Sequence, residues 1–161
     1  MGADKTVAVI GAGRASEAVT KLAYEVGREI GKHGAVLVCG GLTGVMEAAA
    51  RGARESGGHT LGILPNYDRK SANAHIEFAI ATGMGEARNV VVIATADAVI
   101  ALDGAGGTLA EIGFALKLGR PVVALRAWQN LSNLEHAEEP AEAVELALRL
   151  ANNPPAGTKD G

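Results

Sequence analysis

The chain of 161 residues (16.3 kDa) has the size of one domain with a single hydrophobic core, and we predict that domain over residues 1–151. Hydrophobic residues make up 48% and charged residues 20% of the chain, a composition that excludes an intrinsically disordered protein. The net charge of -3 and the pI near 5.8 argue against a non-specific nucleic-acid binder, which needs a basic face, so no nucleic-acid partner is expected.

The sequence also disfavours a membrane protein and a metal-binding protein. No apolar run reaches the roughly 18 residues of a membrane span, and the first residues lack the basic and apolar regions of a signal peptide. We therefore expect a cytoplasmic protein with no membrane partner. Cys39 is the only cysteine and cannot form an internal disulfide, while the four histidines are scattered without zinc-ligand spacing, so no metal site is expected.

In chain order, short β-branched runs alternate with longer runs rich in Ala, Leu and Glu, which is typical of βαβ units. The fold class predicted is α/β: a three-layer Rossmann-like fold, with a parallel sheet of about six or seven strands flanked by helices. The predicted strands are residues 6–10, 35–39, 59–64, 76–80, 98–102 and 121–125. The predicted helices are residues 16–33, with Ser16 as the N-cap, and residues 43–56, 85–94, 108–118 and 141–151.

Two segments have no apolar periodicity. Residues 152–161 contain paired Asn and Pro residues and are predicted to be a flexible tail. Residues 66–74 form the longest polar connection and follow a predicted strand, where α/β proteins place ligand-binding loops. This segment is either such a loop or an ordinary surface loop.

The first glycine-rich turn follows the first strand and contains Gly11, Gly13 and Arg14. It nearly matches the dinucleotide fingerprint, but Ser16 stands where the third Gly or Ala belongs. The second strand ends in Cys39 rather than in the acidic residue that binds the ribose of NAD, so an NAD site is not expected. Arg14 either reaches a phosphate group or extends into solvent.

Two further glycine-rich turns also join a predicted strand to a predicted helix. Because the carboxyl ends of parallel strands meet at one edge of the sheet, we expect all three turns to surround one crevice. Their backbone N–H groups favour a phosphorylated ligand, and no Walker sequence follows any of them. The ligand-binding candidates in these two turns are Gly40, Gly41, Thr43 and Gly44, and Asp103, Gly104, Gly106, Gly107 and Thr108.

The third turn and the preceding arginine resemble a known family. Arg88, followed by the run from Asp103 to Glu111, is similar to the signature of the Lonely Guy (LOG) group: Arg-Lys, then Pro-Gly-Gly-x-Gly-Thr-x-x-Glu. The second turn resembles the upstream glycine turn of that group. The resemblance covers most of the chain between residues 7 and 125.

LOG enzymes cleave the N-glycosidic bond of nucleoside 5′-monophosphates, and the resemblance implies that Arg88 and Glu111 are the catalytic pair. A carboxylate can stabilise the oxocarbenium-like sugar or activate a water, as in glycosidases. Arg88 would orient the substrate, and residues 104–108 would hold the 5′-phosphate. This hydrolysis requires no cofactor. The resemblance also implies a homodimer or a higher homo-oligomer, and the small residues of segment 45–53 could pack against a partner or against the chain's own sheet.

The chain also departs from the LOG signature. Asn89 stands where LOG enzymes have Lys, Asp103 replaces Pro, and Ala105 replaces Gly. These changes resemble a side branch of the superfamily that includes molybdenum-cofactor carriers, which bind a phosphorylated pterin without chemistry. Asn89 remains a ligand-binding candidate in both cases. The sequence thus leaves two functions open: a phosphoribohydrolase, and a carrier that binds the molybdenum cofactor.

Several residues also have a structural interpretation. Thr108 and Glu111 have the spacing of a capping box, in which the hydroxyl and the carboxylate satisfy backbone N–H groups at a helix start. Met46 is expected to pack in the core and Glu47 to lie in solvent. Trp128 follows the last predicted strand and is either an oligomer contact or a lid over the crevice.

Overall fold

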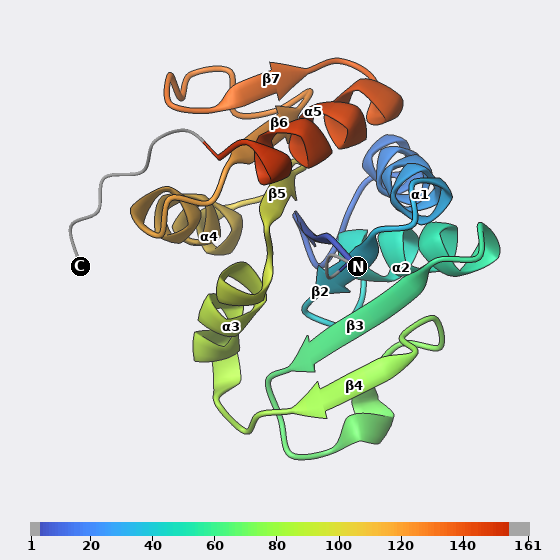
Figure 1. Cartoon of the computed structure of the whole chain (residues 1–161). Helices are drawn as coiled ribbons and strands as arrows, with labels where there is room; N and C mark the ends of the chain where they lie inside the picture. The colour runs from blue at the N-terminus through green and yellow to red at the C-terminus, as the bar shows by residue number, and fades with distance from the viewer. Residues whose placement is uncertain (1–3, 155–161) are drawn as a thin grey trace.

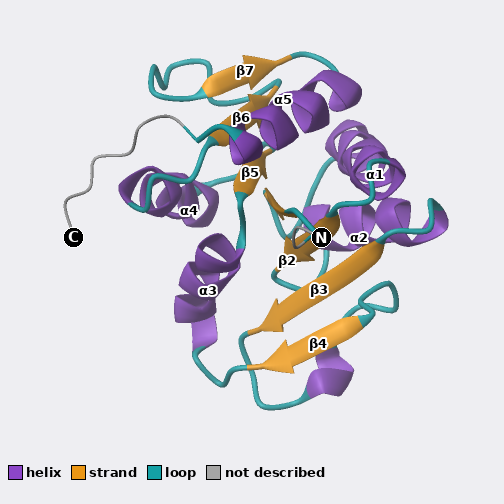
Figure 2. Cartoon of the chain, viewed as in Figure 1, coloured by secondary structure: helices purple, strands orange, loops and turns teal. Residues whose placement is uncertain are grey.

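All seven strands of the protein are parallel and form one sheet, which the computed structural model describes over residues 4–154 (Figures 1 and 2). The order across the sheet is β4-β3-β2-β1-β5-β6-β7. The strands are β1 (Thr6–Ile10), β2 (Val36–Cys39), β3 (His59–Leu64), β4 (Phe78–Ala81), β5 (Ala98–Ala101), β6 (Val122–Leu125) and β7 (Glu135–Ala137). The chain winds outward in one direction from β1 to β4 and then crosses back to β5. This reversal places the switch point of the sheet between β1 and β5.

Helices cover both faces of the sheet, as the three-layer prediction requires. The helices α1 (Glu17–Lys32), α2 (Val45–Glu55) and α5 (Pro140–Asn152) pack on one face, and α3 (Arg88–Thr95) and α4 (Gly106–Lys117) pack on the other. Two single 3-10 turns, η1 (Arg69–Ser71) and η2 (Gly85–Ala87), complete the connections.

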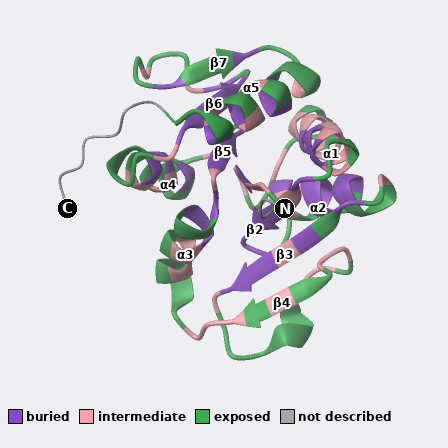
Figure 3. Cartoon of the chain, in the orientation of Figure 1, coloured by how far each residue is buried: buried purple, intermediate pink, exposed green. Residues whose placement is uncertain are grey.

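The alternation of side chains along β1 shows how one sheet supplies two cores. Val7 and Val9 point into the core under α1, α2 and α5, whereas Ala8 and Ile10 point into the core under α3 and α4. The central strands are buried on both sides, and buried residues form the middle of the molecule in Figure 3. This double burial explains why the strands appear in the sequence as continuous apolar runs.

The predicted elements differ from the structure at several boundaries. Residues 76–80 were predicted as a strand, whereas β4 runs from Phe78 to Ala81, because an Asn73 turn holds the chain as far as Ile76. Strand β7 was not predicted, since Glu135-His136-Ala137 has no apolar run and pairs only at the sheet edge. The predicted helix 85–94 is divided into η2 and α3. Asn152, assigned to the predicted tail, closes α5, and residues 155–161 lie outside the described residues.

Helices α1 and α2 pack together so closely that their backbones touch. A Cβ on Gly27 would overlap the backbone carbonyl of Ala49, and one on Gly52 would overlap that of Tyr24. The alanines of α2, including Ala48 and Ala50, are therefore buried inside the chain. The small residues of segment 45–53 thus pack against α1 and the sheet of their own chain. Among residues 4–154, no helix has the length and apolarity needed to cross a membrane.

Candidate functional site

The three glycine-rich turns meet at the carboxyl ends of β1, β2 and β5, as predicted. The backbone N–H of Ala12 in the first turn donates to the carbonyl of Asp103 in the third, at 3.0 Å. The Val45 N–H donates to the Ala12 carbonyl at 3.1 Å, and the Thr43 hydroxyl donates to the Gly13 carbonyl at 3.0 Å. Gly44 permits this contact, because its φ of 68° and the nearby Ala12 carbonyl leave no room for a side chain. The turns are thus hydrogen-bonded into one rim.

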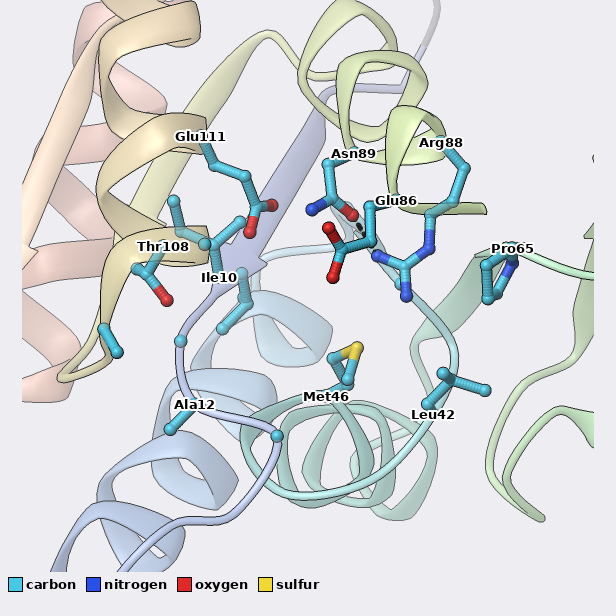
Figure 4. Close-up of a pocket in the computed structure, with 16 residues that line it drawn as sticks. Ile10, Ala12, Leu42, Met46, Pro65, Glu86, Arg88, Asn89, Thr108 and Glu111 are labelled. Atoms are coloured by element: carbon cyan, nitrogen blue, oxygen red, sulfur yellow. Dashed lines mark hydrogen bonds between the residues drawn. The ribbon is translucent and has the colours of Figure 1, made fainter. Parts of the chain in front are cut away.

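This rim surrounds a pocket of about 430 Å³ at the switch point (Figure 4). Its walls come from the first turn, the start of α2, the end of β3, the start of α3 and the start of α4. In Figure 4, Thr108 and Glu111 lie on the α4 side, and Leu42 and Pro65 lie on the opposite side. The lining residues are Val9, Ile10, Gly11, Ala12, Gly13, Gly40, Leu42, Met46, Pro65, Glu86, Arg88, Asn89, Ala105, Gly107, Thr108 and Glu111.

Arg88 begins α3 and extends its guanidinium over Gly40 at the end of β2. A Cβ at residue 40 would lie 2.5 Å from Nη1 of Arg88 and 2.7 Å from Cζ, so only glycine lets the guanidinium lie there. Nη1 donates to Oδ1 of the neighbouring Asn89. The Nε–H is buried and has no partner among the described residues. Burial lowers the pKa of Arg88, while the charge of Glu111 acts to raise it.

Glu111 lies on the first turns of α4, and its carboxyl group is largely removed from solvent. This burial raises the pKa of Glu111 to about 7, and the nearby charge of Arg88 partly opposes the shift. A carboxyl group with such a pKa can accept or release a proton near neutral pH, which an ordinary surface glutamate does poorly. Figure 4 shows Glu111 and Arg88 extending into the same pocket from α4 and α3.

The capping-box interpretation of Thr108 and Glu111 is wrong. Helix α4 begins at Gly106 with Ala105 as its N-cap, so Thr108 is the third residue of the helix and caps nothing. The predicted start at residue 108 was therefore two residues late. No side chain caps α4, and in α-helical geometry the N–H groups of Gly106, Gly107 and Thr108 have no acceptor in their own helix. These donors and the helix dipole favour an anion at this wall of the pocket.

The predicted site residues fall into two groups. Eight line the pocket: Gly11, Gly13, Gly40, Arg88, Asn89, Gly107, Thr108 and Glu111. The other seven are not among the residues that line it: Arg14, Gly41, Thr43, Gly44, Asp103, Gly104 and Gly106. Several of the second group build the rim instead, as the bonds of Thr43 and Asp103 show. The side chain of Arg14 is exposed.

Sequence reasoning missed part of the pocket. Glu86 supplies a second carboxylate from η2, and Leu42, Met46 and Pro65 form an apolar wall. Met46 is only half-buried and takes part in this wall, whereas Glu47 is exposed as expected. The signal that could have found Glu86 is its place in the sequence, two residues before Arg88. Because η2 leads directly into α3, the two residues lie close together. Leu42 and Pro65 carry no pattern that marks them as pocket residues.

Two other sequence candidates lie elsewhere. Trp128 donates from Nε1 to the carbonyl of Leu102 at 2.9 Å and packs on the core under α3 and α4, so it does not cover the pocket. Segment 66–74 touches the second turn, where the side chain of Asn73 donates to the Leu42 carbonyl at 2.7 Å. Within residues 4–154, no cluster of three or more His, Cys, Asp or Glu could hold a metal ion.

Two proteins of known sequence resemble this chain over most of its length. A protein of Archaeoglobus fulgidus is 42% identical over 142 residues, which cover 88% of this chain and 93% of that protein. The cytokinin riboside 5′-monophosphate phosphoribohydrolase of Mycobacterium tuberculosis is 33% identical over 141 residues, which cover 81% of this chain and 75% of the enzyme.

Solved structures with the same fold include molybdenum-cofactor proteins. The molybdenum cofactor binding protein of Rippkaea orientalis superposes with a TM-score of 0.87 at 35% identity, over 91% of this chain and 97% of that one. The molybdenum cofactor carrier protein of Chlamydomonas reinhardtii gives a TM-score of 0.86 at 30% identity, over 92% and 99% of the two chains. The resemblance to the LOG-like superfamily, in the branch that includes these carriers, is confirmed. A family model described as the SLOG cluster4 family matches residues 4–153, and the chain belongs to that family.

Proposed function

We propose that this protein binds a phosphorylated, nucleotide-like ligand in the pocket at the switch point and hydrolyses the N-glycosidic bond of a nucleoside 5′-monophosphate. The observation that carries this proposal is the Glu111 carboxyl group, which is half-buried in the pocket near Arg88 with its pKa raised to about 7. The phosphoribohydrolase relative, 33% identical, supports the same reaction. The reaction uses water as its co-substrate and needs no cofactor.

The two ends of the pocket suit the two ends of such a ligand. The unpaired N–H groups at the start of α4, beside Gly107 and Thr108, would bind the 5′-phosphate. Leu42, Met46 and Pro65 would contact the flat faces of the base, since apolar side chains favour such a ring over water. The buried Nε–H of Arg88 would gain an acceptor from the ligand, which removes the cost of an unsatisfied buried donor.

In the proposed reaction, the bond between the anomeric carbon and the base nitrogen breaks, and its electron pair leaves with the base. The oxygen of a water molecule bonds to the anomeric carbon, and Glu111 takes one proton from that water. That proton then passes to the leaving base, so the products are the free base and ribose 5-phosphate. Arg88 would orient the sugar phosphate through charge-assisted hydrogen bonds.

Free-base release from a panel of nucleoside 5′-monophosphates tests the proposal. Glu111→Gln keeps the size of the side chain but removes the group that exchanges a proton, so we expect turnover to fall by about 10²-fold or more. The matched control is Glu47→Gln on α2, which removes an exposed carboxylate outside this pocket. Equal turnover in the wild type and in Glu111→Gln would show that the assigned role is wrong.

The alternative function is a non-catalytic carrier of the molybdenum cofactor. The observation that favours it is the close superposition on two molybdenum-cofactor proteins, with TM-scores of 0.87 and 0.86. The same N–H groups at the start of α4 would then bind the phosphate of the pterin, and no bond would break. Stabilisation of the fold by a molybdopterin ligand, with no base release from any nucleotide, would favour the carrier over the hydrolase.

We also propose that the protein forms a homodimer. Exposed apolar side chains lie on the sheet face that carries α3 and α4, although the small residues of α2 are buried inside the chain. Ile80 of β4 pairs in register with Ile63, whose side chain belongs to the core under α3, so Ile80 shares that face. The exposed members are Phe78, Ile80, Val90, Leu109 and Leu116.

A further inference from the structure

Glu86 is a pocket residue whose carboxylate has no hydrogen-bond or ion-pair partner among residues 4–154. It lies on η2, two residues before Arg88, and in Figure 4 its side chain extends inward between Asn89 and the guanidinium of Arg88. The ion pairs of residues 4–154 leave Glu86 unpaired, and their side-chain hydrogen bonds do not use its carboxylate oxygens. Two acceptor oxygens therefore face the pocket.

The groups around Glu86 do not satisfy these oxygens. Nη1 of Arg88 is already bonded to Asn89, and the guanidinium lies against Gly40. The side chain of Glu111 extends from α4 on the other side of the pocket, and no hydrogen bond joins it to Glu86. An ionised carboxylate only accepts hydrogen bonds. Glu86 would therefore bind a ligand that places O–H or N–H groups at this position.

The position of Glu86 along the pocket indicates which part of the ligand it meets. The start of α4, with Thr108, forms the end that would take the phosphate, and Leu42 with Pro65 forms the apolar end. In Figure 4, Glu86 lies between these ends. The part of a nucleotide between its phosphate and its base is the sugar. The two neighbouring hydroxyl groups of ribose are both donors, and a carboxylate can accept from both.

We propose that Glu86 is a ligand-binding residue that accepts hydrogen bonds from the 2′- and 3′-hydroxyl groups and so selects ribonucleotides over 2′-deoxyribonucleotides. This inference rests on the proposed function, because it assumes that a nucleotide phosphate binds at the start of α4. Acidic residues bind ribose hydroxyls in the same way in other Rossmann-like sites, where they follow the second strand. Here Cys39 ends that strand, and Glu86 supplies the carboxylate from a different element.

Calorimetric binding of adenosine 5′-monophosphate and 2′-deoxyadenosine 5′-monophosphate tests this role. Every protein in this assay carries Glu111→Gln, so that turnover does not consume the ligand, and the Glu111→Gln single variant is the parent. We expect this parent to bind the ribonucleotide about tenfold more tightly than the deoxyribonucleotide, the cost of one lost hydrogen bond to a charged group. Adding Glu86→Ala should reduce this ratio to near one by weakening ribonucleotide binding. Adding Glu47→Gln, outside the pocket, should leave the ratio unchanged.

The outcomes separate this inference from the proposed function. A parent that binds both nucleotides equally, or a preference that persists in Glu86→Ala, would overturn the role of Glu86 and leave the hydrolase proposal intact. A parent that binds neither nucleotide would overturn the nucleotide site itself, and the role of Glu86 with it. Because Glu86 is exposed on a 3-10 turn, Glu86→Ala should fold, and its unfolding temperature in the same buffer checks this.

Discussion

The pKa of Glu111 links the proposed catalytic residue to the stability of the fold. Burial raises this pKa from 4.5 to about 7, so between these pH values the folded protein holds a proton that the unfolded chain releases. The unfolded state thus binds fewer protons, and the free energy of unfolding falls as pH rises through this window. Once ionised, the buried carboxylate destabilises the fold by about 3 kcal/mol, an order-of-magnitude figure.

Glu111→Gln should remove this dependence, because an amide does not ionise. We expect the variant to gain stability relative to the wild type as pH rises from 4.5 to 8, by at most about 3 kcal/mol. Urea denaturation at several pH values measures the difference in free energy of unfolding. A difference that stays constant with pH would show that the folded-state pKa of Glu111 is not raised.

Gly40 controls the position of the Arg88 guanidinium. In Gly40→Ala, the new methyl group would lie 2.5 Å from Nη1, so the flexible end of the arginine must move. We expect nucleotide binding to weaken about tenfold or more, since charge-assisted hydrogen bonds depend on position, while the fold loses little stability. Calorimetry measures the binding. The control is Gly113→Ala on α4, where a Cβ meets open space; similar binding by both variants would contradict this role for Gly40.

At the scale of elements, apolar patterning predicted most of the fold and turn chemistry predicted less of the site. Strands β1 and β3 have the predicted bounds, and in β1 the four residues after Thr6 are buried, which leaves a continuous apolar run. Strand β7 could not be predicted in this way, since only Ala137 of its three residues is buried. The glycine turns marked the correct edge of the sheet, but Glu86 lies outside any glycine motif and was missed.

The contact between α1 and α2 depends on two glycines. Gly27→Ala would push a methyl group into the carbonyl of Ala49, and a backbone in the middle of a helix cannot move away as a side chain can. We expect the free energy of unfolding to fall by about 1–3 kcal/mol or more. Urea denaturation checks this. Gly113→Ala should be neutral or stabilising by up to about 1 kcal/mol, and an equal effect in both variants would contradict the packing argument.

At the scale of the whole molecule, the two faces of the sheet are covered unequally. Three helices cover one face, whereas only α3 and α4 cover the other, and α3 has only eight residues. The sequence could not show this difference, because the side on which each helix packs follows from the crossover between β4 and β5. The consequence is that apolar side chains stay exposed on this face, and the same two helices supply Arg88 and Glu111 to the pocket.

The proposed homodimer would bury this surface. Phe78 is 58% exposed and Leu116 is 37% exposed, and neither lines the pocket. A charge at these positions costs little in a monomer but is unfavourable in an apolar interface. We therefore expect a double variant, Phe78→Lys with Leu116→Lys, to be a folded monomer, whereas the wild type sediments as a dimer in analytical ultracentrifugation.

The control for this experiment is Gln129→Lys, which adds a charge at an exposed position in the loop after β6, outside the apolar surface defined above. It should remain a dimer. A wild-type monomer, or a dimer that survives both lysines, would contradict the proposed interface. Because Arg88 lies on α3 and Glu111 on α4, the same variants reveal whether assembly matters for the site. Base release that falls on dissociation, with circular dichroism unchanged, would mean that a partner stabilises the helices that position these two residues.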